Sequence, residues 1–169
     1  PDATGKAILG ITAAGSNPRE FNGIDLGAIL LENYDNTTKA FGDSGNTWHQ
    51  ALAILGLFAS EMEIPQDTLE TLIGLQLDDG GWEYSTGLGT SPDSTSLAMQ
   101  ALIAAGYSED DQVIINGLDY LKNTQSDDGG WGDSSTTSYT MMFLNSIGQS
   151  FDNWISDSGK VPYANLLSY

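Results

Sequence analysis

The chain has no cysteine, only five basic residues and a single histidine, His49. Without cysteine it can form no disulfide, no thiolate nucleophile and no cysteine-ligated zinc or iron–sulfur site. Five scattered cations cannot form the basic stripe that nucleic acids require, and a formal net charge of -18 repels phosphate backbones and anionic lipids. We therefore expect no nucleic-acid partner.

Long hydrophobic runs are absent as well. No apolar stretch approaches the roughly 18 to 20 residues of a membrane-spanning helix, so we expect no membrane insertion. Pro1 is neither an initiator methionine nor the start of a signal peptide, which suggests a segment of a larger protein. What is present is a 169-residue chain with 40% hydrophobic residues, enough to bury the core of a single domain over residues 1–169.

One seven-residue motif occurs twice, 49 residues apart. It reads Gln-Leu-Asp-Asp-Gly-Gly-Trp at residues 76–82 and Gln-Ser-Asp-Asp-Gly-Gly-Trp at residues 125–131, so six of its seven positions are identical. An amphipathic stretch precedes each copy, and a small-residue loop and an apolar stretch that ends in glycine follow it. The repeating unit is therefore predicted to be a helix, a turn and a second helix.

Weaker copies extend this unit over nearly the whole chain. Helices before a turn are predicted at 26–33, 68–75, 117–124 and 161–169, and helices after a turn at 5–14, 47–57, 94–106 and 136–148. Phe41 takes the tryptophan position in the first, degenerate turn, and the Gln-Ala-Leu triplet at 50–52 matches that at 100–102. No alternating pattern typical of β-strands competes with this interpretation.

The two kinds of helix differ in polarity. Helices after a turn are apolar nearly all round, which is typical of inner helices enclosed by neighbours, whereas those before a turn carry polar residues opposite a narrow apolar stripe. Alternating inner and outer antiparallel helices stack into a curved solenoid. The predicted fold class is therefore all-α, an α/α toroid or partial toroid of about four helical hairpins in two layers.

We interpret the repeated motif as a structural corner. Its glycine pair allows close backbone approach, its aspartates can accept bonds from backbone N–H groups, and its tryptophan can pack against its glutamine. Two alternatives stay open here, a calcium site formed by paired carboxylates and a sugar platform formed by an exposed tryptophan. The residues assigned to the structural turn are Gln76, Asp79, Gly80, Gly81 and Trp82, with Gln125, Asp128, Gly129, Gly130 and Trp131 in the second copy.

The stretch from Leu118 to Trp131, LDYLKNTQSDDGGW, resembles the QW repeat of squalene and oxidosqualene cyclases, also called the prenyltransferase/squalene oxidase repeat. The resemblance implies the α/α toroid of terpenoid cyclases and protein prenyltransferase β subunits. That fold is also similar to cobalamin carriers, complement thioester domains and bacterial surface proteins, so it does not select one function. In the cyclases the motif's glutamine and tryptophan are regarded as structural.

The catalytic motifs of these relatives are missing from the sequence. The chain has no Asp-x-Asp-Asp motif, which supplies the central acid of class II cyclases, and the run Glu109-Asp110-Asp111 is predicted to lie in a loop before a helix. The lack of cysteine removes the prenyltransferase zinc site and the thioester, and His49 has no obvious serine partner. We expect no catalytic residue, metal or other cofactor here, while the enzyme question stays open.

Side chains of the inner helices could line a central cavity, because polar groups in an apolar helix must be paired or face a wet space. The candidate ligand-binding residues are Trp48, His49, Gln50, Gln100 and Tyr139. For His49 and the two glutamines we favour structural hydrogen bonds over ligand contact. Tyr84 and Tyr107, which lie near turns, are expected to be buried anchors.

The function that fits these observations is a non-catalytic binding or structural domain of a larger protein, with an extracellular or cell-surface location. Its partners would be flanking domains of the parent chain, or further copies of itself that complete the ring, because an arc exposes apolar ends. Two alternatives remain. One is part of an enzyme, cyclase-like or acting on polysaccharides, whose catalytic residues lie elsewhere; the other is a domain similar to the cobalamin carriers.

Overall fold

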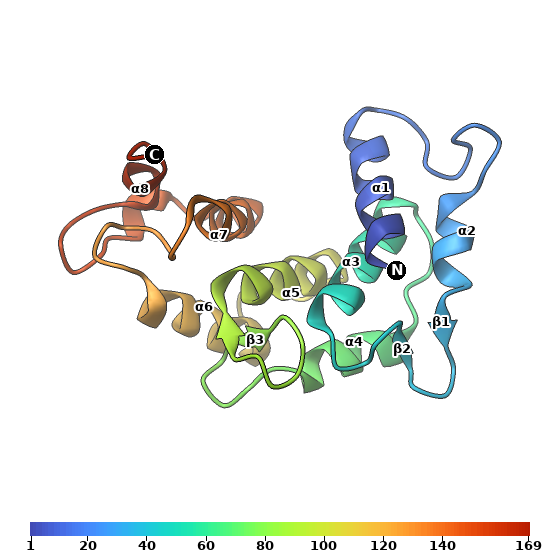
Figure 1. The fold of residues 1–169 in the computed structure, drawn as a ribbon, viewed down its shortest axis with the longest axis horizontal. Helices are drawn as coiled ribbons and strands as arrows, with labels where there is room; N and C mark the ends of the chain where they lie inside the picture. The colour runs from blue at the N-terminus through green and yellow to red at the C-terminus, as the bar shows by residue number, and fades with distance from the viewer.

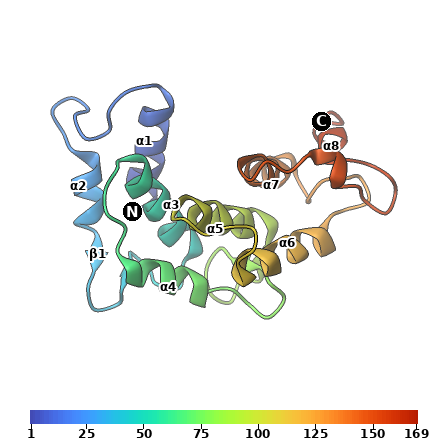
Figure 2. The same cartoon turned by 180° about the vertical axis from the view of Figure 1, so that it is seen from behind.

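Eight helices alternate between the inner and outer layers of an arc (Figure 1). The computed structural model describes residues 1–169. The inner helices are α1 (Asp2–Ala13), α3 (Thr47–Ala59), α5 (Pro92–Ala104) and α7 (Ser134–Ser146), and the outer helices are α2 (Leu26–Leu31), α4 (Gln66–Gly74), α6 (Gln112–Thr124) and α8 (Pro162–Leu166). Each inner helix packs on the next inner helix, and each outer helix covers the inner helix beside it. The predicted fold class, all-α with two layers of hairpins, is confirmed (Figure 2).

Two short antiparallel strand pairs are the one departure from the all-helical expectation. Strand β1 (Tyr34–Asp35) pairs with β2 (Ala40–Phe41), and β3 (Trp82–Glu83) pairs with β4 (Thr90–Ser91). Each strand has two residues, which is too short to show the alternation by which a strand is recognised in a sequence. Both pairs lie where the chain turns from an outer helix to the next inner helix, so they belong to the corners.

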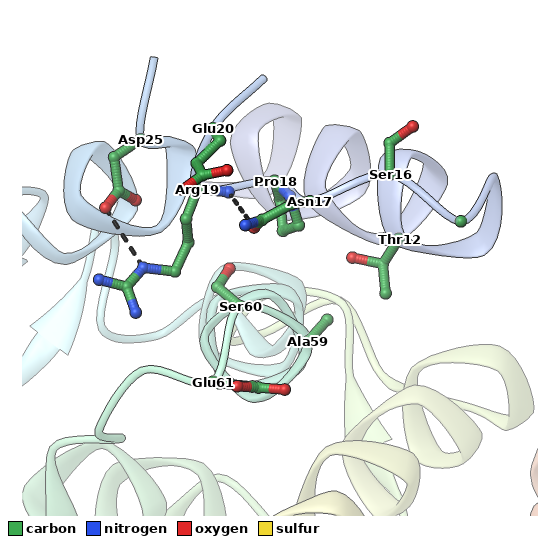
Figure 3. A pocket seen from close by; sticks show the side chains of 11 residues that line it. Thr12, Ser16, Asn17, Pro18, Arg19, Glu20, Asp25, Ala59, Ser60 and Glu61 are labelled. Carbon is green, nitrogen blue, oxygen red and sulfur yellow. Dashed lines mark hydrogen bonds and ion pairs between the residues drawn. The ribbon is translucent and has the colours of Figure 1, made fainter. Parts of the chain in front are cut away.

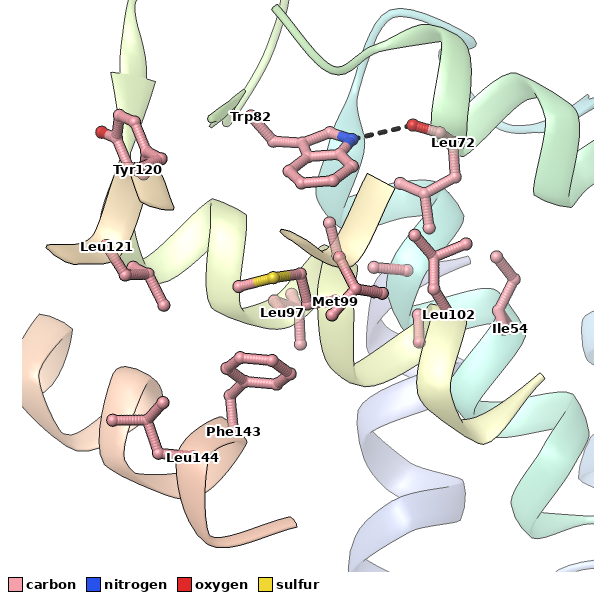
Figure 4. Close-up of a cluster of buried hydrophobic side chains, with 14 of the residues drawn as sticks. Ile54, Leu72, Trp82, Leu97, Met99, Leu102, Tyr120, Leu121, Phe143 and Leu144 are labelled. Atoms are coloured by element: carbon pink, nitrogen blue, oxygen red, sulfur yellow. Dashed lines mark hydrogen bonds between the residues drawn. The ribbon is translucent and has the colours of Figure 1, made fainter. Parts of the chain in front are cut away.

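The main hydrophobic core lies between the two layers from α3 to α7 (Figure 4). Met99 and Leu102 of α5 are fully buried in it, as are Leu72 of the outer layer, Phe143 of the inner layer and the corner residue Trp82. A second, smaller cluster joins α1, α2, the first corner and α3, and it contains Ile8, Leu30, Phe41, Ala53 and Leu57. The inner helices α3 and α5 are therefore enclosed by neighbours, as their composition predicts.

The register between inner helices corrects one expectation from the sequence. The first residues of α3 and α5, Thr47 and Pro92, are 45 residues apart, and so are their last residues, Ala59 and Ala104. The triplets at 50–52 and 100–102 therefore occupy different positions in the two helices. Helices rich in alanine and leucine contain similar short triplets at several positions, so identity over three residues does not fix the register.

The four inner helices end in the same way. The second residue after the last helical one is Gly15, Gly106 or Gly148 in three of them, with φ of +75°, +102° and +74°, and Glu61 in α3, with φ of +53°. In each case the next N–H bonds back to a carbonyl in the last turn, as Met62 N–H does to Leu57. Glycine adopts this left-handed conformation freely, whereas a residue with a Cβ atom is strained there.

We predict that Glu61→Gly stabilises the chain by about 1 kcal/mol, because it removes this strain. The matched variant is Gly106→Ala, which should destabilise by about the same amount, since a Cβ at Gly106 meets no atom within 4 Å and so acts only through the backbone. Urea unfolding followed by circular dichroism measures both changes. A Glu61→Gly variant that is no more stable than the parent would show that the backbone at Glu61 is not strained.

Candidate ligand-binding site

The first repeated motif forms a hydrogen-bonded corner that joins two outer helices. Gln76 Nε2 donates to the carbonyl of Gly80 at 3.0 Å and to the carbonyl of Val113, in α6, at 2.9 Å. The indole N–H of Trp82 donates to the carbonyl of Leu72, in the last turn of α4, at 2.8 Å. The corner therefore closes the end of one outer helix and attaches it to the start of the next.

The second motif repeats this geometry. Gln125 Nε2 donates to the carbonyls of Gly129 and Trp154, both at 2.9 Å. The indole N–H of Trp131 donates to the carbonyl of Leu121, in the last turn of α6, at 2.7 Å. Two sequences 49 residues apart thus make the same set of bonds, which is the behaviour of a structural element of the repeat.

A further bond ties each corner to the inner helix that follows it. The backbone N–H of Trp82 donates to Thr95 Oγ1, and that of Trp131 donates to Thr137 Oγ1, both at 2.9 Å. The two partners are 13 residues apart in the first corner and 6 residues apart in the second. The corner therefore forms with loops of quite different length between tryptophan and inner helix.

The buried position of both tryptophans corrects the sugar-platform alternative. Trp82 is 0% exposed and Trp131 is 1% exposed, so neither ring can stack on a ligand. The calcium alternative finds no support in the aspartates, because Asp79 Oδ1 and Asp128 Oδ1 each accept a backbone N–H of their own turn at 3.0 Å. The chain has no group of three or more histidine, aspartate or glutamate side chains that could hold a metal ion.

The glycine pair is needed because the corner presses against the next outer helix. Gly80 has a φ of +85°, and a Cβ atom there would collide with the carbonyl of Asn116 in α6. Gly129 has a φ of +91° and lies in the same way against the backbone of Val161, at the start of α8. Both motifs therefore require glycine for conformation and for space.

Two of the candidate ligand-binding residues are used by the first, degenerate corner. Gln50 is fully buried; its Oε1 accepts the N–H of Phe41 at 2.8 Å, and its Nε2 donates to the carbonyls of Phe41 and Asp43. His49 Nδ1 accepts the N–H of Asp43 at 3.1 Å. The Gln50 amide has no polar atom left for a ligand, so it belongs to the corner. Its Oε1 accepts the backbone N–H of Phe41, as Thr95 Oγ1 accepts that of Trp82 in the next corner.

Two other candidates, Trp48 and Tyr139, lie together with Tyr84. The ring centroids of Trp48 and Tyr139 are 5.4 Å apart, and those of Trp48 and Tyr84 are 5.7 Å apart. Trp48 also donates its indole N–H to Ser94 Oγ at 3.0 Å, and the ammonium group of Lys6 lies 5.2 Å from the centre of its ring. We call Trp48, Tyr84 and Tyr139 the aromatic cluster.

The aromatic cluster is assembled from segments far apart in the sequence. Trp48 belongs to α3 and Tyr139 to α7, while α5 lies between these two helices, so their contact passes over α5 (Figure 1). Tyr84 comes from the loop between β3 and β4 and is 45% exposed, which corrects its expected role as a buried anchor. Sequence reasoning missed Lys6, because nothing in its helix indicates that it meets Trp48.

The fifth candidate, Gln100, has a different environment. Its side-chain nitrogen is buried and has no hydrogen-bond partner. The structural hydrogen bonds expected for the two glutamines are therefore present for Gln50, within its own corner, and absent for the side-chain nitrogen of Gln100. The structure therefore brings Trp48 and Tyr139 together in the aromatic cluster. Of the other three predicted residues, His49 and Gln50 bond to the first corner, and Gln100 belongs to neither group.

A cleft lies elsewhere, between the C-terminal ends of α1 and α3 and the start of α2 (Figure 3). It has a volume of about 710 Å³ and a polar lining that includes Glu20 and Glu61. Arg19 Nε pairs with Asp25 Oδ2 at 3.3 Å, and Asp25 Oδ1 caps α2 by accepting the N–H of Ala28 at 2.9 Å. The Ala28 N–H, with a smaller contribution from Arg19, holds the pKa of Asp25 below its usual value.

A second, smaller hollow has a volume of about 250 Å³. It lies between the end of α5 and the starts of α4 and α6, and Tyr107, Gln66 and Asp111 are among its lining residues. None of the five predicted ligand residues lines either hollow. Since both lie at the C-terminal ends of inner helices, we attribute them to the way the hairpins stack.

The profile of the squalene-hopene cyclase C-terminal domain matches residues 49–154, well over half of the chain. The chain belongs to this family. The matched residues include both complete corners and the core from α3 to α7. No solved structure matches the chain at a significant level.

Membership in the squalene-hopene cyclase C-terminal domain family confirms the resemblance on which the fold was predicted. Within the matched region, the run Glu109-Asp110-Asp111 lies at the start of α6, where Asp111 Oδ2 accepts the N–H of Ser108 at 2.7 Å. This acidic run therefore lies in the loop before a helix, as the sequence predicts. No helix of this family member is long and apolar enough to cross a membrane.

The corner geometry predicts the effect of an isosteric change at Gln76. In Gln76→Glu the two donors that face the carbonyls of Gly80 and Val113 are replaced by a carboxylate, so the folded state should lose about 2 kcal/mol at neutral pH. Below about pH 4 the introduced carboxyl is protonated and can donate one bond, so part of the loss should be recovered relative to the parent at the same pH.

The matched control is Gln112→Glu, since Gln112 is exposed and bonds only to Asn116 Oδ1. Urea unfolding of all three chains at neutral and acidic pH measures the differences. Equal stabilities of Gln76→Glu and Gln112→Glu at neutral pH would contradict the bridging role of Gln76.

Proposed function

We propose that the chain is a non-catalytic binding or structural domain of a larger, surface or secreted protein, and that the aromatic cluster is its contact surface. The observation that carries the proposal is that Trp48 alone, of the four tryptophans, is partly exposed. Trp82, Trp131 and Trp154 are buried, whereas Trp48 is half-buried and stands between two tyrosines. Large, partly exposed aromatic groups that cluster on one surface are typical of binding sites.

The charge of the chain restricts the ligand class. A formal net charge of -18 disfavours anionic ligands. A cationic ligand is disfavoured as well, because the ammonium group of Lys6 already lies over the Trp48 ring. Tyrosine and tryptophan offer flat apolar faces with a polar edge, which suits the apolar faces and hydroxyl groups of sugar rings. We therefore favour a neutral glycan as the ligand.

The polar side chains best suited to acid–base chemistry or to polar ligand contact hold the backbone in place, which supports a role without catalysis. His49 Nδ1 accepts a backbone N–H, Gln50 is saturated by the first corner, and Asp79 and Asp128 accept backbone N–H groups in the repeated corners. A side chain that holds the backbone in this way cannot move a proton to or from a substrate without opening the corner.

Trp48 is itself the reporter for the binding test. Acrylamide quenching of tryptophan fluorescence is measured with and without soluble neutral glucan, xylan or mannan, and we expect one of them to protect Trp48. Tyr84→Ala should weaken that protection about tenfold, because one wall of the cluster is lost. The control Trp154→Phe removes a buried indole and should leave the protection intact.

The catalytic alternative is tested on the same preparation. The chain is incubated with detergent-solubilised squalene, and the extract is examined by gas chromatography and mass spectrometry. We expect unchanged squalene, and a cyclised product would overturn the proposal in favour of an enzyme. Absence of protection by all the polysaccharides would instead remove the glycan-binding part and leave the structural role.

A further inference from the structure

The loop between β3 and β4 is docked on the segment that leads into α3. The N–H of Thr47, the first residue of α3, donates to the carbonyl of Tyr84 at 3.1 Å. The N–H and the Oγ1 of Thr86 both donate to the carbonyl of Gly45, at 2.9 and 3.2 Å. Because Trp48 follows Thr47 in α3, these bonds bring Tyr84 to the side of the Trp48 ring.

The carboxylate of Glu83 closes this loop, residues 84–89, at its base. Its Oε2 accepts the N–H of Gly87 at 2.8 Å, and its Oε1 accepts that of Gly89 at 2.6 Å. Both glycines have a left-handed backbone, with φ of +90° and +85°, and a Cβ atom on either would meet nothing within 4 Å. Glycine therefore serves conformation here, and both N–H groups reach one carboxylate, whose charge strengthens the two bonds.

The corner itself does not need the bonds of Glu83. In the second corner the residue after the tryptophan is Gly132, and α7 begins at Ser134 without a loop of this kind. That corner still makes the glutamine, threonine and indole bonds of the first. The comparison of the two corners therefore assigns the Glu83 carboxylate to the loop and not to the helical frame.

The far side of the loop has little else to hold it. Leu88, between the two glycines, is 70% exposed, and its N–H donates to the carbonyl of Ser85 at 3.2 Å. Without the carboxylate, residues 87–89 would depend on this one bond within the loop. Glu83 directly precedes Tyr84, so a carboxylate tied to the far side of the loop also fixes the backbone from which the tyrosine ring extends.

We propose that Glu83 is a positioning residue of the aromatic cluster: its carboxylate holds the loop closed and thereby keeps the Tyr84 ring against Trp48. The inference rests on the proposed function, in which Tyr84 forms one wall of the ligand site. Glu83 acts through Tyr84, because a loop that is already ordered loses less conformational entropy when a ligand binds. The affinity for a neutral glycan is thus set in part by the order of this loop.

Acrylamide quenching of the free chain tests the positioning, with a Trp48→Phe chain giving the background from the buried indoles. Tyr84→Ala uncovers one side of Trp48 and should raise the quenching constant. Glu83→Gln should raise it as well, since an amide keeps one acceptor and turns a donor toward the second N–H. Glu83→Ala, which keeps neither acceptor, should come close to Tyr84→Ala.

The matched control is Glu70→Gln, the same change at an exposed glutamate of α4, and it should leave the quenching constant unchanged. Chymotrypsin adds a second measurement on the loop: cleavage after Leu88 should be faster in Glu83→Ala than in Glu70→Gln. Circular dichroism should show an unchanged fold in every variant, because the second corner forms without a counterpart of Glu83.

A double-mutant cycle with a protecting glycan tests whether Glu83 acts through Tyr84. We expect Glu83→Gln to weaken the protection of Trp48 about fivefold, Tyr84→Ala about tenfold, and the double variant also about tenfold, because the tyrosine carries the whole effect. A double variant weakened about fiftyfold would show two independent contributions and overturn the positioning role.

Failure of this inference and failure of the proposed function give different results. If no polysaccharide protects Trp48, the glycan-binding part of the proposed function fails, while the free chain still decides whether Glu83 positions Tyr84. Equal quenching of the parent, Glu83→Gln and Glu83→Ala chains overturns the inference, whether or not a glycan binds. Unchanged cleavage after Leu88 in Glu83→Ala overturns it too, because the carboxylate would then not be what holds the loop closed.

Discussion

The end of an outer helix leaves carbonyl groups without intrahelical partners, and the corner tryptophan and glutamine satisfy this requirement. Trp82 and Trp131 each donate an indole N–H to a carbonyl in the last turn of the outer helix before them. The glutamine at the end of the same helix reaches forward to the backbone ahead of, or within, the next outer helix. In α4 and α6 this one device both closes the outer helix and attaches it to the part of the outer layer that follows.

Apart from the indole bond to the outer helix before it, each of the two complete corners makes its contacts forward along the chain. Each corner holds the outer helix that follows it, through the glutamine, through the close approach of glycine and through one residue on that helix. The inner layer is held differently, by helix-to-helix packing from α1 to α7. The outer layer thus sets the spacing between hairpins, and the inner helices supply more than half of the buried hydrophobic residues.

The sequence predicts the fold well because its strongest signals are local. The twin seven-residue motif, the apolar periodicity and the glycines after the helix ends all act within about one repeat of the chain, and they place all eight helices. The register between α3 and α5 shows the limit of this approach. Their first residues, Thr47 and Pro92, are equivalent because the two helices begin there, whereas the similar triplets inside the helices suggest a different register. Two-residue strands carry too little pattern to be recognised.

The candidate site was less predictable because its parts come together only in three dimensions. Trp48 and Tyr139 could be named as inner-helix residues, but their contact over α5 depends on the curvature of the arc. Lys6 and Tyr84 come from a helix and a loop that carry no sign of this meeting. Gln50 was named for its polarity within an apolar helix, and that polarity serves a corner whose tryptophan has become Phe41.

The threonine that receives the tryptophan N–H lies 13 residues downstream in one corner and 6 in the other, with the same bond length in both. The intervening segment can therefore grow or shrink during evolution while the surrounding architecture stays intact. One of these segments carries Tyr84 to the side of Trp48. Insertions and deletions at this point can give related proteins new recognition loops on an unchanged helical frame, in the way that variable loops diversify other scaffolds.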